Sequence, residues 1–496
     1  MLDKHNNGGD KKMEICSFCD KPSDEVQHLI TSKKGNICNE CVDICNDSIN
    51  EKVKERQYKY IYQLLNKHFG NIPPDEITTA SRSFPARMRA DIQIVLDKEY
   101  IKSALKTVGI NIQHAHEEIS FSGLLLKDRN SKTIAPLQYE DLDIGEDEPI
   151  KCLLNGILLH KKQGIPFAIL VVIRQDYYGR NTCRVEIAVP AGEKSIKLVD
   201  RIFRNFEQAV ETAHSYRGKV LSLEVRDRYS GTSSGITVHK LVPISRKDIV
   251  LPESTLRLLE RNVIDFVKRR HELKRLKMST KKGLLFFGPP GTGKTHTVNY
   301  LASCLQNHTT LLITAEQVGL LAEYFTLARL LQPSILVIED VDLIARDRSS
   351  MDGICEEVLL NQLLNEMDGL REEADIICIL TTNRPDMLEA ALASRPGRID
   401  QAIEFPLPDD KGREQLIKLY AHGLKLSKDL VQTIVSKTEG VSASFIKELM
   451  RRSAQYHLDK ADSGKILALD SLESALDEML FSAGKLNVKL LGGMRE

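Results

Sequence analysis

The sequence predicts an α/β protein built around a parallel five-stranded sheet, with a helical region behind it and two smaller modules in front. Two patterns lead to this fold class. Short apolar runs alternate with helical stretches in residues 246–408, and half of the ten cysteines crowd into residues 16–45. Length is the third observation, since a chain of 496 residues suggests about three domains rather than one core.

The chain begins with a polar stretch and a cysteine-rich module. Residues 1–12 are expected to be disordered, and residues 13–50 hold two C-x₂-C knuckles that are 18 residues apart. This spacing is typical of a closed tetrahedral Zn²⁺ site with four thiolates, while a redox pair or a disulfide cluster stays open as an alternative. In a reducing compartment the clustering favours metal. The four expected ligands are Cys16, Cys19, Cys38 and Cys41.

Residues 51–245 are predicted to form a helix and then an α+β domain that binds a partner or a substrate. Ser48–Phe69 has the pattern of an amphipathic helix that ends at Gly70. The rest mixes helical and strand periods and carries no motif to which chemistry can be attached. The expected elements are helices over Ala86–Val108 and Ser195–Tyr216 and strands in Ile150–Ile173, Arg184–Val189, Lys219–Val225 and Ile236–Val242.

The central sheet contains a phosphate-binding pattern. Its first strand, Gly283–Phe287, breaks into a glycine-rich loop before a helical pattern opens. The loop fits the template G-x-x-x-x-G-K-[ST], in which backbone N–H groups and a helix N-terminus face a phosphate chain. The Lys294 ammonium would reach the β- and γ-phosphates, and the Thr295 hydroxyl would ligate Mg²⁺. The predicted nucleotide-binding residues are Gly288, Pro289, Pro290, Gly291, Thr292, Gly293, Lys294, Thr295 and His296.

Polar residues end two further strands of this sheet. One strand, which starts at Ser334, ends in Glu339 and Asp340, and another, which starts at Asp375, ends in Asn383. Because the carboxyl ends of parallel strands share one edge, these side chains should gather around the phosphates. One acid is needed to hold hydrated Mg²⁺ and the other to orient or deprotonate the attacking water, which an amide can help to fix. The remaining expected strands are Thr309–Ala315 and Gln401–Leu407.

Residues 409–496 are predicted to form a helical lid that closes over the nucleotide. Apolar residues recur there at helical spacing and are expected to form a core. The predicted helices are Gly412–His422, Lys428–Glu439, Ser444–Lys460 and Ser471–Phe481.

The motifs of residues 246–490 together resemble the AAA ATPases, in particular the proteasomal and valosin-containing-protein-like branch. GPPGTGKT, ILVIEDVD, LLNQLLNEMDGL, TTNRPDML and SRPGRID occur in that family's order. The resemblance implies Mg²⁺-dependent ATP hydrolysis in a ring of like subunits, usually a hexamer. It also implies the following roles: Asn383 as sensor 1, Arg395 and Arg398 as fingers inserted into the neighbouring subunit's site, and Asp248 and Ile249 at the adenine.

The cysteine module has a separate resemblance. The pattern CSFC…LITSKKGNICNECVDIC in residues 16–45 resembles the zinc-binding domain of ClpX. In that family the module dimerises and receives adaptors and substrates. The resemblance therefore implies a ClpX-type recognition module joined to a different AAA motor.

Three features depart from the pattern of threading unfoldases. The acidic pair is Glu339-Asp340, whereas most of the family has Asp before Glu, so by position Glu339 should serve Mg²⁺ and Asp340 the water. Glu316–Pro333 lacks the aromatic-aliphatic-Gly triplet that grips polypeptide, and Gly440–Phe445 has no sensor-2 arginine. The sequence also has no peptidase-docking motif, so a partner peptidase is not expected.

Composition narrows the possible partners. Lys+Arg and Asp+Glu are both 69, so no net charge steers the chain toward nucleic acid or an anionic membrane. No run reaches the roughly 18 apolar residues of a membrane span, and the N-terminus lacks an apolar signal-peptide core. A cytoplasmic protein without a membrane partner is expected.

The leading functional hypothesis is an ATP-driven, ring-forming remodeller of proteins or protein complexes, with targets recruited through the zinc module and the α+β domain. A second hypothesis is a nucleotide-gated assembly switch with slow hydrolysis and no threading, which the acid order and the missing triplet favour. A nucleic-acid-dependent ATPase, using the zinc module and the basic residues of Lys268–Lys282, is a third.

Overall fold

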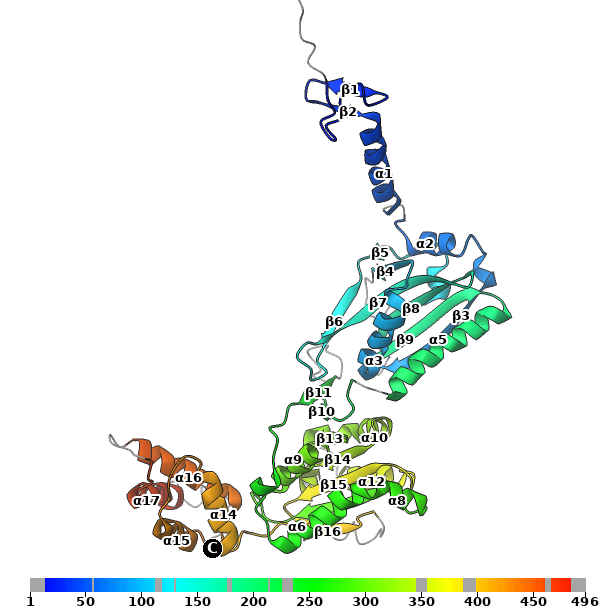
Figure 1. The fold of residues 1–496 in the computed structure, drawn as a ribbon. Coiled ribbons are helices and arrows are strands. Elements are labelled where there is room, and N and C mark those ends of the chain that lie inside the picture. The colour runs from blue at the N-terminus through cyan, green and yellow to red at the C-terminus, as the bar shows by residue number, and fades with distance from the viewer. Residues whose placement is uncertain are drawn as a thin grey trace, which may run out of the picture.

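A computed structural model of the chain describes residues 14–55, 58–111, 118–128, 131–175, 181–212, 215–224, 235–344, 355–386, 398–459 and 465–482. Four parts follow one another along the chain: a zinc module, an antiparallel sheet with helices, an α/β domain and a helical lid (Figure 1). The predictions for residues 1–12 and for Arg395 concern positions outside the described residues.

The cysteine module is a β-hairpin followed by a helix. Strands β1 (Leu29–Ser32) and β2 (Gly35–Cys38) pair antiparallel, and α1 (Asn39–Glu55) begins directly after the second knuckle's first cysteine. The single helix expected over Ser48–Phe69 is wrong, because α1 starts earlier and α2 (Ile61–His68) is separate. Tyr60 is extended and bridges to Thr133, which stops the helical path before α2.

The α+β domain is a seven-stranded sheet in the order β3-β9-β8-β7-β4-β5, with β6 paired to β7, and every pairing is antiparallel. Helices α2 and α4 (Phe121–Leu124) pack on one face of the sheet, and α3 (Arg89–Val95) and α5 (Glu193–Thr212) pack on the other. The strands are β3 (Ile77–Pro85), β4 (Lys106–Ile110), β5 (Ile134–Ala135), β6 (Gln138–Leu142), β7 (Ile150–Lys162), β8 (Ile165–Gln175) and β9 (Asn181–Pro190).

Sequence reasoning placed α5 and the strands β7, β8 and β9, but it assigned part of β4 to a helix and missed β3, β5 and β6. The helix expected over Ala86–Val108 ends at Ile101, after a π-helical turn that continues α3, and its last residues belong to β4. The β-branched Val108 is buried in the core beneath α2 and α4, which overrides the helical spacing. Strand β3 was not predicted, because its Thr- and Ser-rich sequence shows neither a clear apolar run nor a clear alternation.

The second seven-stranded sheet has the order β11-β10-β13-β14-β15-β12-β16. The five predicted strands are neighbours in it and run parallel, as expected. Two strands expected in the α+β domain extend this sheet instead, with β10 parallel to β13 and β11 antiparallel to β10. The strands are β10 (Val220–Leu223), β11 (Ile236–His239), β12 (Lys282–Phe287), β13 (Thr309–Ile313), β14 (Ser334–Ile338), β15 (Ile376–Thr382) and β16 (Gln401–Glu404).

The extension of the sheet has a packing cause. Leu221 and Leu223 of β10 are buried in one apolar cluster with Leu311 and Ile313 of β13, and Met88 from the edge of α3 joins the same cluster. The two sheets are therefore joined by a continuous core. The boundary expected at residue 245 does not coincide with an edge of the parallel sheet.

Helices flank the parallel sheet and form the lid. Each of α14, α15 and α16 starts after a residue whose side chain accepts a backbone N–H three residues on, namely Asp409, Ser427 and Ser442. The lid has its own apolar core. The helices are η4 (Arg246–Asp248), α6 (Glu253–Leu259), η5 (Glu260–Asp265), α7 (Phe266–Lys268), α8 (Arg270–Arg275), α9 (Lys294–Cys304), η6 (Ala315–Leu320), α10 (Leu321–Leu330), α11 (Val341–Ile344), α12 (Cys355–Asp368), α14 (Asp410–Tyr420), α15 (Lys428–Lys437), α16 (Ala443–Leu458), α17 (Leu469–Asp477) and η7 (Glu478–Ser482).

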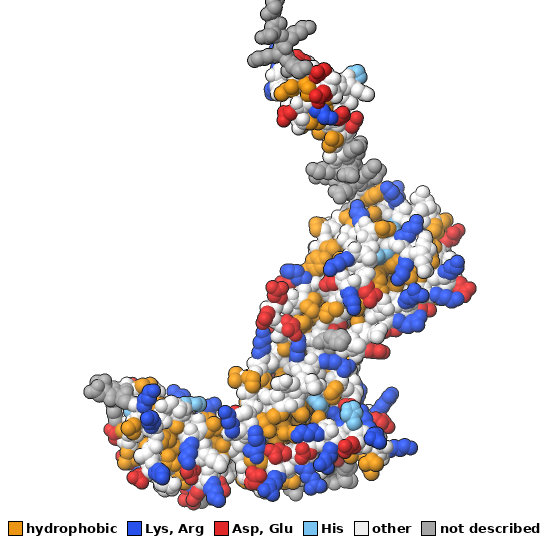
Figure 2. All heavy atoms as spheres, viewed as in Figure 1, with side chains coloured by type: hydrophobic (Ala, Val, Ile, Leu, Met, Phe, Trp, Pro, Cys, Tyr) orange, Lys and Arg blue, Asp and Glu red, His pale blue; other side chains and the backbone are white. Residues whose placement is uncertain are grey.

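The surface is electrically mixed. On the face drawn in Figure 2, Lys and Arg side chains alternate with Asp and Glu side chains over all four parts. In the part of the chain that the structure describes, no helix has the length and apolar character that a membrane crossing needs.

Candidate functional site

The glycine-rich loop joins β12 to α9 at the carboxyl edge of the parallel sheet. Gly293 precedes α9 in the left-handed region, at φ 100°, and its position leaves the first N–H groups of the helix facing outward. Gly288 has no room for a side chain, because a Cβ there would lie 2.2 Å from the Phe405 carbonyl oxygen. The loop is therefore shaped as the phosphate-binding template requires.

Lys294 is held at the centre of this loop. Its ammonium donates hydrogen bonds to the Gly288 and Pro289 carbonyl oxygens, at 2.9 and 3.0 Å, and to Asn383 Oδ1, at 2.8 Å. Burial lowers the pKa of Lys294, and the nearby carboxylates of Asp340 and Asp342 oppose that shift. The ammonium thus donates to three protein oxygens, and the oxygens of a bound phosphate can take their place as acceptors.

Of the three predicted polar strand ends, Asp340 and Asn383 meet each other. Asn383 Nδ2 donates to Asp340 Oδ1 at 3.0 Å, so Lys294, Asn383 and Asp340 form one hydrogen-bonded chain. Asp342, which the sequence reasoning did not single out, anchors this chain by accepting the Asn383 N–H at 3.1 Å and the Thr382 hydroxyl at 2.8 Å. Glu339 Oε1 is buried and has no hydrogen-bond partner among the described residues.

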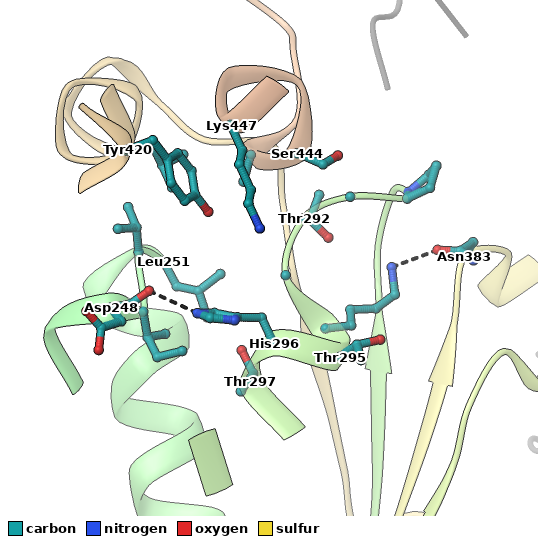
Figure 3. Close-up of a pocket in the computed structure, with 18 of the residues that line it drawn as sticks. Asp248, Leu251, Thr292, Thr295, His296, Thr297, Asn383, Tyr420, Ser444 and Lys447 are labelled. Carbon is teal, nitrogen blue, oxygen red and sulfur yellow. Dashed lines mark hydrogen bonds between the residues drawn. The ribbon is translucent and has the colours of Figure 1, made fainter. Parts of the chain in front are cut away.

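A cavity of about 430 Å³ opens beside this chain (Figure 3). Asp340, Asn383 and the loop from Pro290 to His296 line it, as do Asp248 and Ile249 from the far side. His296 bonds to the Asp248 carbonyl oxygen at 3.2 Å, which ties the two walls together. Gly288, Pro289 and Glu339 are not among the lining residues, and the first two act through their carbonyl groups.

The predicted lid supplies one wall of the cavity, through residues that sequence reasoning did not single out. Tyr420 of α14 and Ser444 and Lys447 of α16 line the cavity, and Tyr420 and Lys447 point into it from above in Figure 3. The Ser444 N–H donates to the Gly291 carbonyl oxygen at 3.1 Å. Lys447 forms no ion pair with any described residue. The i, i+3 spacing of Ser444 and Lys447 on one helix was the available signal, but it does not reveal which face meets the loop.

Arg398 lies away from this cavity. Its guanidinium bonds bidentately to the Asp368 carboxylate at the end of α12, with Nε 2.8 Å from Oδ1. The side chain is 10% exposed, and its Nη1 has no hydrogen-bond partner among the described residues. The structure therefore does not bring Arg398 to the nucleotide cavity of its own chain.

The four predicted metal ligands come together in the N-terminal module. The sulfur atoms of Cys16, Cys19, Cys38 and Cys41 all lie within 4.8 Å of one another, and those of Cys19 and Cys38 are 3.7 Å apart. Four thiolates at about 2.3 Å from a tetrahedral Zn²⁺ would be separated by about 3.8 Å, so the cluster has the right size. Cys45 is outside the cluster.

Backbone groups prepare these thiols for metal. Cys38 N–H points to Cys16 Sγ at 3.3 Å, and Cys41 N–H points to Cys38 Sγ at 3.4 Å. Burial alone would raise the pKa of Cys16, but backbone hydrogen bonds outweigh it and lower the pKa to about 6. The pKa of Cys41 is raised by its sulfur neighbours. A cation is what allows four thiolates to share this space.

Comparison with known proteins decides the family. Residues 284–407 match the model of the ATPase family associated with various cellular activities (AAA). The 26S proteasome regulatory subunit 8 homolog of Encephalitozoon cuniculi is 31% identical over 291 residues, which are 52% of this chain and 72% of that protein. The chain belongs to the AAA ATPase family. The nucleotide of an AAA domain is ATP with Mg²⁺.

Two further relatives match about half of the chain. The proteasome-activating nucleotidase of Methanopyrus kandleri is 34% identical over 238 residues, 44% of this chain and 53% of that protein. The ATP-dependent zinc metalloprotease FtsH of Thermus thermophilus is 31% identical over 278 residues, 53% of this chain and 43% of that protein. The chain thus spans about half the length of these two relatives.

The N-terminal module has its own match. Residues 14–51 match the model of the ClpX C4-type zinc finger. The sulfur geometry and this match together identify the cluster as a zinc centre, and the prediction of Zn²⁺ is confirmed. In this chain a zinc finger of the type that the sequence indicated therefore precedes the AAA domain.

Proposed function

We propose that this protein is an ATP-hydrolysing, ring-forming AAA ATPase that remodels or unfolds protein substrates or complexes recruited through its zinc module. The observation that carries the proposal is the hydrogen-bonded chain Lys294–Asn383–Asp340 beside a glycine-rich loop, in a cavity closed by the lid. AAA family members form hexameric rings and act on proteins. We therefore expect a homo-oligomeric, hexameric ring.

The residues of the loop side have separable tasks in this proposal. The N–H groups at the start of α9 and the Lys294 ammonium bind the phosphates. Thr295 and Glu339 would hold Mg²⁺, and the unpartnered Glu339 oxygen is the type of ligand that a hydrated cation prefers. Mg²⁺, when bound, neutralises phosphate charge. Asp248 and Ile249 would face the adenine.

The strand ends would act on the attacking water. Asp340 accepts a hydrogen bond from Asn383 through one carboxylate oxygen, so its other oxygen is placed to orient the water or take its proton. Asn383 would fix the same water and sense the γ-phosphate. When phosphate oxygens replace the Lys294 contact, the Asn383 amide becomes free to turn toward them.

The two arginines are assigned to the neighbouring subunit's site. A cation supplied across an interface stabilises charge on the transferring phosphoryl group. Arg398 is distant from its own cavity and has an unsatisfied Nη1 among the described residues, which supports a role outside its own chain. Arg395 is proposed for the same role from its motif alone.

A second candidate function is a nucleotide-gated assembly switch. It is favoured by the structure of the segment that corresponds to the polypeptide-gripping loop of threading relatives. Here Glu316–Pro333 forms η6 and α10, and Tyr324 is buried. The Tyr324 hydroxyl accepts the Leu223 N–H at 2.7 Å, and Gln317 donates to the Leu223 carbonyl oxygen at 2.7 Å. This segment is fixed to β10, so movement of a free pore loop is not expected.

The nucleic-acid hypothesis gains no support. Within the basic stretch of Lys268–Lys282, Arg270 and Lys274 pair with Asp375, and Lys281 pairs with Glu372. Lys268 pairs with Asp265, so four of the eight Lys and Arg side chains of this stretch are already opposed by a carboxylate and are less available to phosphates. The clustered free thiols fit a reducing compartment, so we place the protein in the cytoplasm.

The function is tested by steady-state ATP hydrolysis of the purified assembly, with and without a permanently unfolded polypeptide. Three proteins are compared: wild type, Asp340→Asn and Cys38→Ser. Asp340→Asn should bind ATP normally and lose turnover by about a hundredfold, because the amide cannot take a proton. Cys38→Ser should keep basal turnover and lose stimulation by the polypeptide, since the zinc module no longer folds.

The outcomes separate the two candidates. Turnover that polypeptide stimulates supports the remodeller, whereas tight ATP binding with negligible, unstimulated turnover supports the switch. Full activity in Asp340→Asn would contradict the assignment of the water to Asp340. Undiminished stimulation in a zinc-free Cys38→Ser protein would contradict recruitment by the zinc module.

A further inference from the structure

Strand β3 is the outer strand of the α+β sheet, and nothing among the described residues pairs with its far side. It pairs only with β9, over nine successive residues from Ile77 to Pro85 without a register shift. Figure 1 shows it at the margin of the sheet, beside α5. Its middle residues are exposed to solvent.

The register tells which backbone groups face outward. Ala191 N–H donates to the Glu76 carbonyl oxygen, so the pairs that bond to β9 involve even-numbered residues of β3. The positions of two prolines are consistent with this assignment. Pro85 of β3 and Pro190 of β9, which lies opposite Ile77, both belong to pairs that share no hydrogen bond, so neither needs an N–H group there. Odd-numbered residues of β3 therefore aim their N–H and C=O groups away from the sheet. In the middle of the strand they are Thr79, Ser81 and Ser83.

Most of the devices that prevent strand pairing are absent from this edge in the described part of the chain. It has no lysine, bulge, inward charge or covering element, and only its last residue, Pro85, is of a type that discourages an added strand. The one charged residue of β3, Arg82, is engaged with Glu207 of α5 at 3.2 Å and lies over the Phe203 ring. The odd positions carry small hydroxyl side chains that do not obstruct a neighbouring backbone. The edge is therefore an open template for one more strand.

The edge runs into a pocket at the junction with the ATPase. Pro85, the last residue of β3, lines a pocket of about 260 Å³ together with Arg87 and Met88. The opposite wall comes from α10, with Leu327 and Leu330. The pocket is mainly apolar and suits an aliphatic or aromatic side chain.

We propose that the free edge of β3 binds an extended segment of a client polypeptide as an added strand, with one apolar client side chain in the junction pocket. This proposal rests on the proposed function and names the form in which a client is held. The match is one of hydrogen-bonding pattern, since only an extended backbone presents alternating donors and acceptors at the spacing of Thr79, Ser81 and Ser83. Because the pocket touches α10, a bound client lies directly against the ATPase domain.

Amide hydrogen exchange of the full-length assembly tests this surface. An unfolded polypeptide of mixed sequence is added in excess, with ADP present throughout. The amides of Thr79, Ser81 and Ser83 should slow at least tenfold, whereas those of even residues such as Ala80, already bonded to β9, should not change. Absence of protection at the odd amides overturns the proposal. Protection that depends on protein concentration without client also overturns it, because the occupant is then a second copy.

Two variants at one position separate backbone from side-chain effects. Ser81→Pro removes an outward N–H without breaking a bond to β9, and should weaken client binding, measured by fluorescence anisotropy, at least tenfold. Ser81→Ala should bind as wild type, because the side chain is not the contact. Equal binding by all three proteins overturns the proposal. ATP turnover is measured for the same three proteins without client. Wild-type turnover in both variants shows that the ATPase site is intact, so this measurement tests the proposed function separately from client binding.

Discussion

The two seven-stranded sheets of this protein show how strand direction decides where function lies. In the ATPase sheet six strands run parallel, and the carboxyl ends of the central ones bring Lys294, Asp340 and Asn383 into one hydrogen-bonded chain. In the α+β sheet every pairing is antiparallel, so strand ends alternate between opposite edges and gather no such chain. This sheet instead offers the unpaired backbone of its outermost strand, β3.

The difference teaches what each sheet can offer. A parallel sheet with helices on both faces collects polar ends and helix N-termini at one edge, which suits a small charged ligand. An antiparallel sheet exposes backbone along its outermost strand, which suits an extended chain. Here the two are joined by a shared core around Tyr216 and Leu311.

The largest expected effect comes from the centre of the parallel edge. Lys294→Ala should lower ATP turnover about a thousandfold, because the cation that meets the developing phosphate charge is removed from a buried position. Amide exchange in β7, β8 and β9 should stay unchanged. Steady-state turnover and exchange, measured on the same sample, check both parts.

A lid lysine provides the matched control. Lys418 of α14 bonds to Glu414 and does not line the cavity, so Lys418→Ala should retain turnover. Comparable losses in the two variants would show that lysine removal acts through general destabilisation. Wild-type turnover in Lys294→Ala would remove the site from this edge of the sheet.

The next effect tests whether the two sheets are one cooperative unit. Tyr216 is 2% exposed and belongs to the core that contains residues of both sheets. Tyr216→Ala should lower the free energy of unfolding by about 3 kcal/mol through the lost burial and the cavity left behind. Amide exchange should accelerate in β7–β9 and in β13–β14 together.

Phe206→Ala sharpens the same comparison. Phe206 is fully buried in the core between α5 and the α+β sheet and stacks on Tyr100, away from the ATPase sheet. Its truncation should accelerate exchange in β7–β9 alone. If Tyr216→Ala also affects only one sheet, the shared core does not couple them.

Sequence reasoning was strongest where local pattern and function coincide. The glycine loop, the acidic strand end and the cysteine knuckles each carry chemistry in adjacent residues, and the structure brings each set together. It failed for β3 and for the attachment of β10, because those depend on which strands meet in space. Thr79 and Ser81 carry no local signal of an edge, and Leu221 fits either sheet equally well.

The nucleotide cavity contains one wall that the strand-end rule does not explain. Tyr420 and Lys447 reach it from the lid, 37 and 64 residues beyond Asn383, the last polar strand end. Their positions follow from lid packing, in which the start of α16 bonds to Gly291. The binding free energy that this wall contributes therefore shows how much of the nucleotide affinity comes from the carboxyl ends of the parallel strands alone.

Lys447→Met tests that wall and has the smallest expected effect. The methionine keeps the apolar stem and removes a charge that points into the cavity and has no ion-pair partner among the described residues. An exposed cation of this kind contributes about 1 kcal/mol, so the Kd for ADP should rise about fivefold.

Titrations of ADP and adenosine at two salt concentrations separate a phosphate contact from a change in lid packing. If Lys447 meets phosphate, only ADP weakens, and Arg451→Met, on the same helix but bound to Glu448, leaves both affinities unchanged. Equal weakening of ADP and adenosine would instead assign the effect to the lid's packing, and the parallel edge would then hold the phosphates without help from the lid.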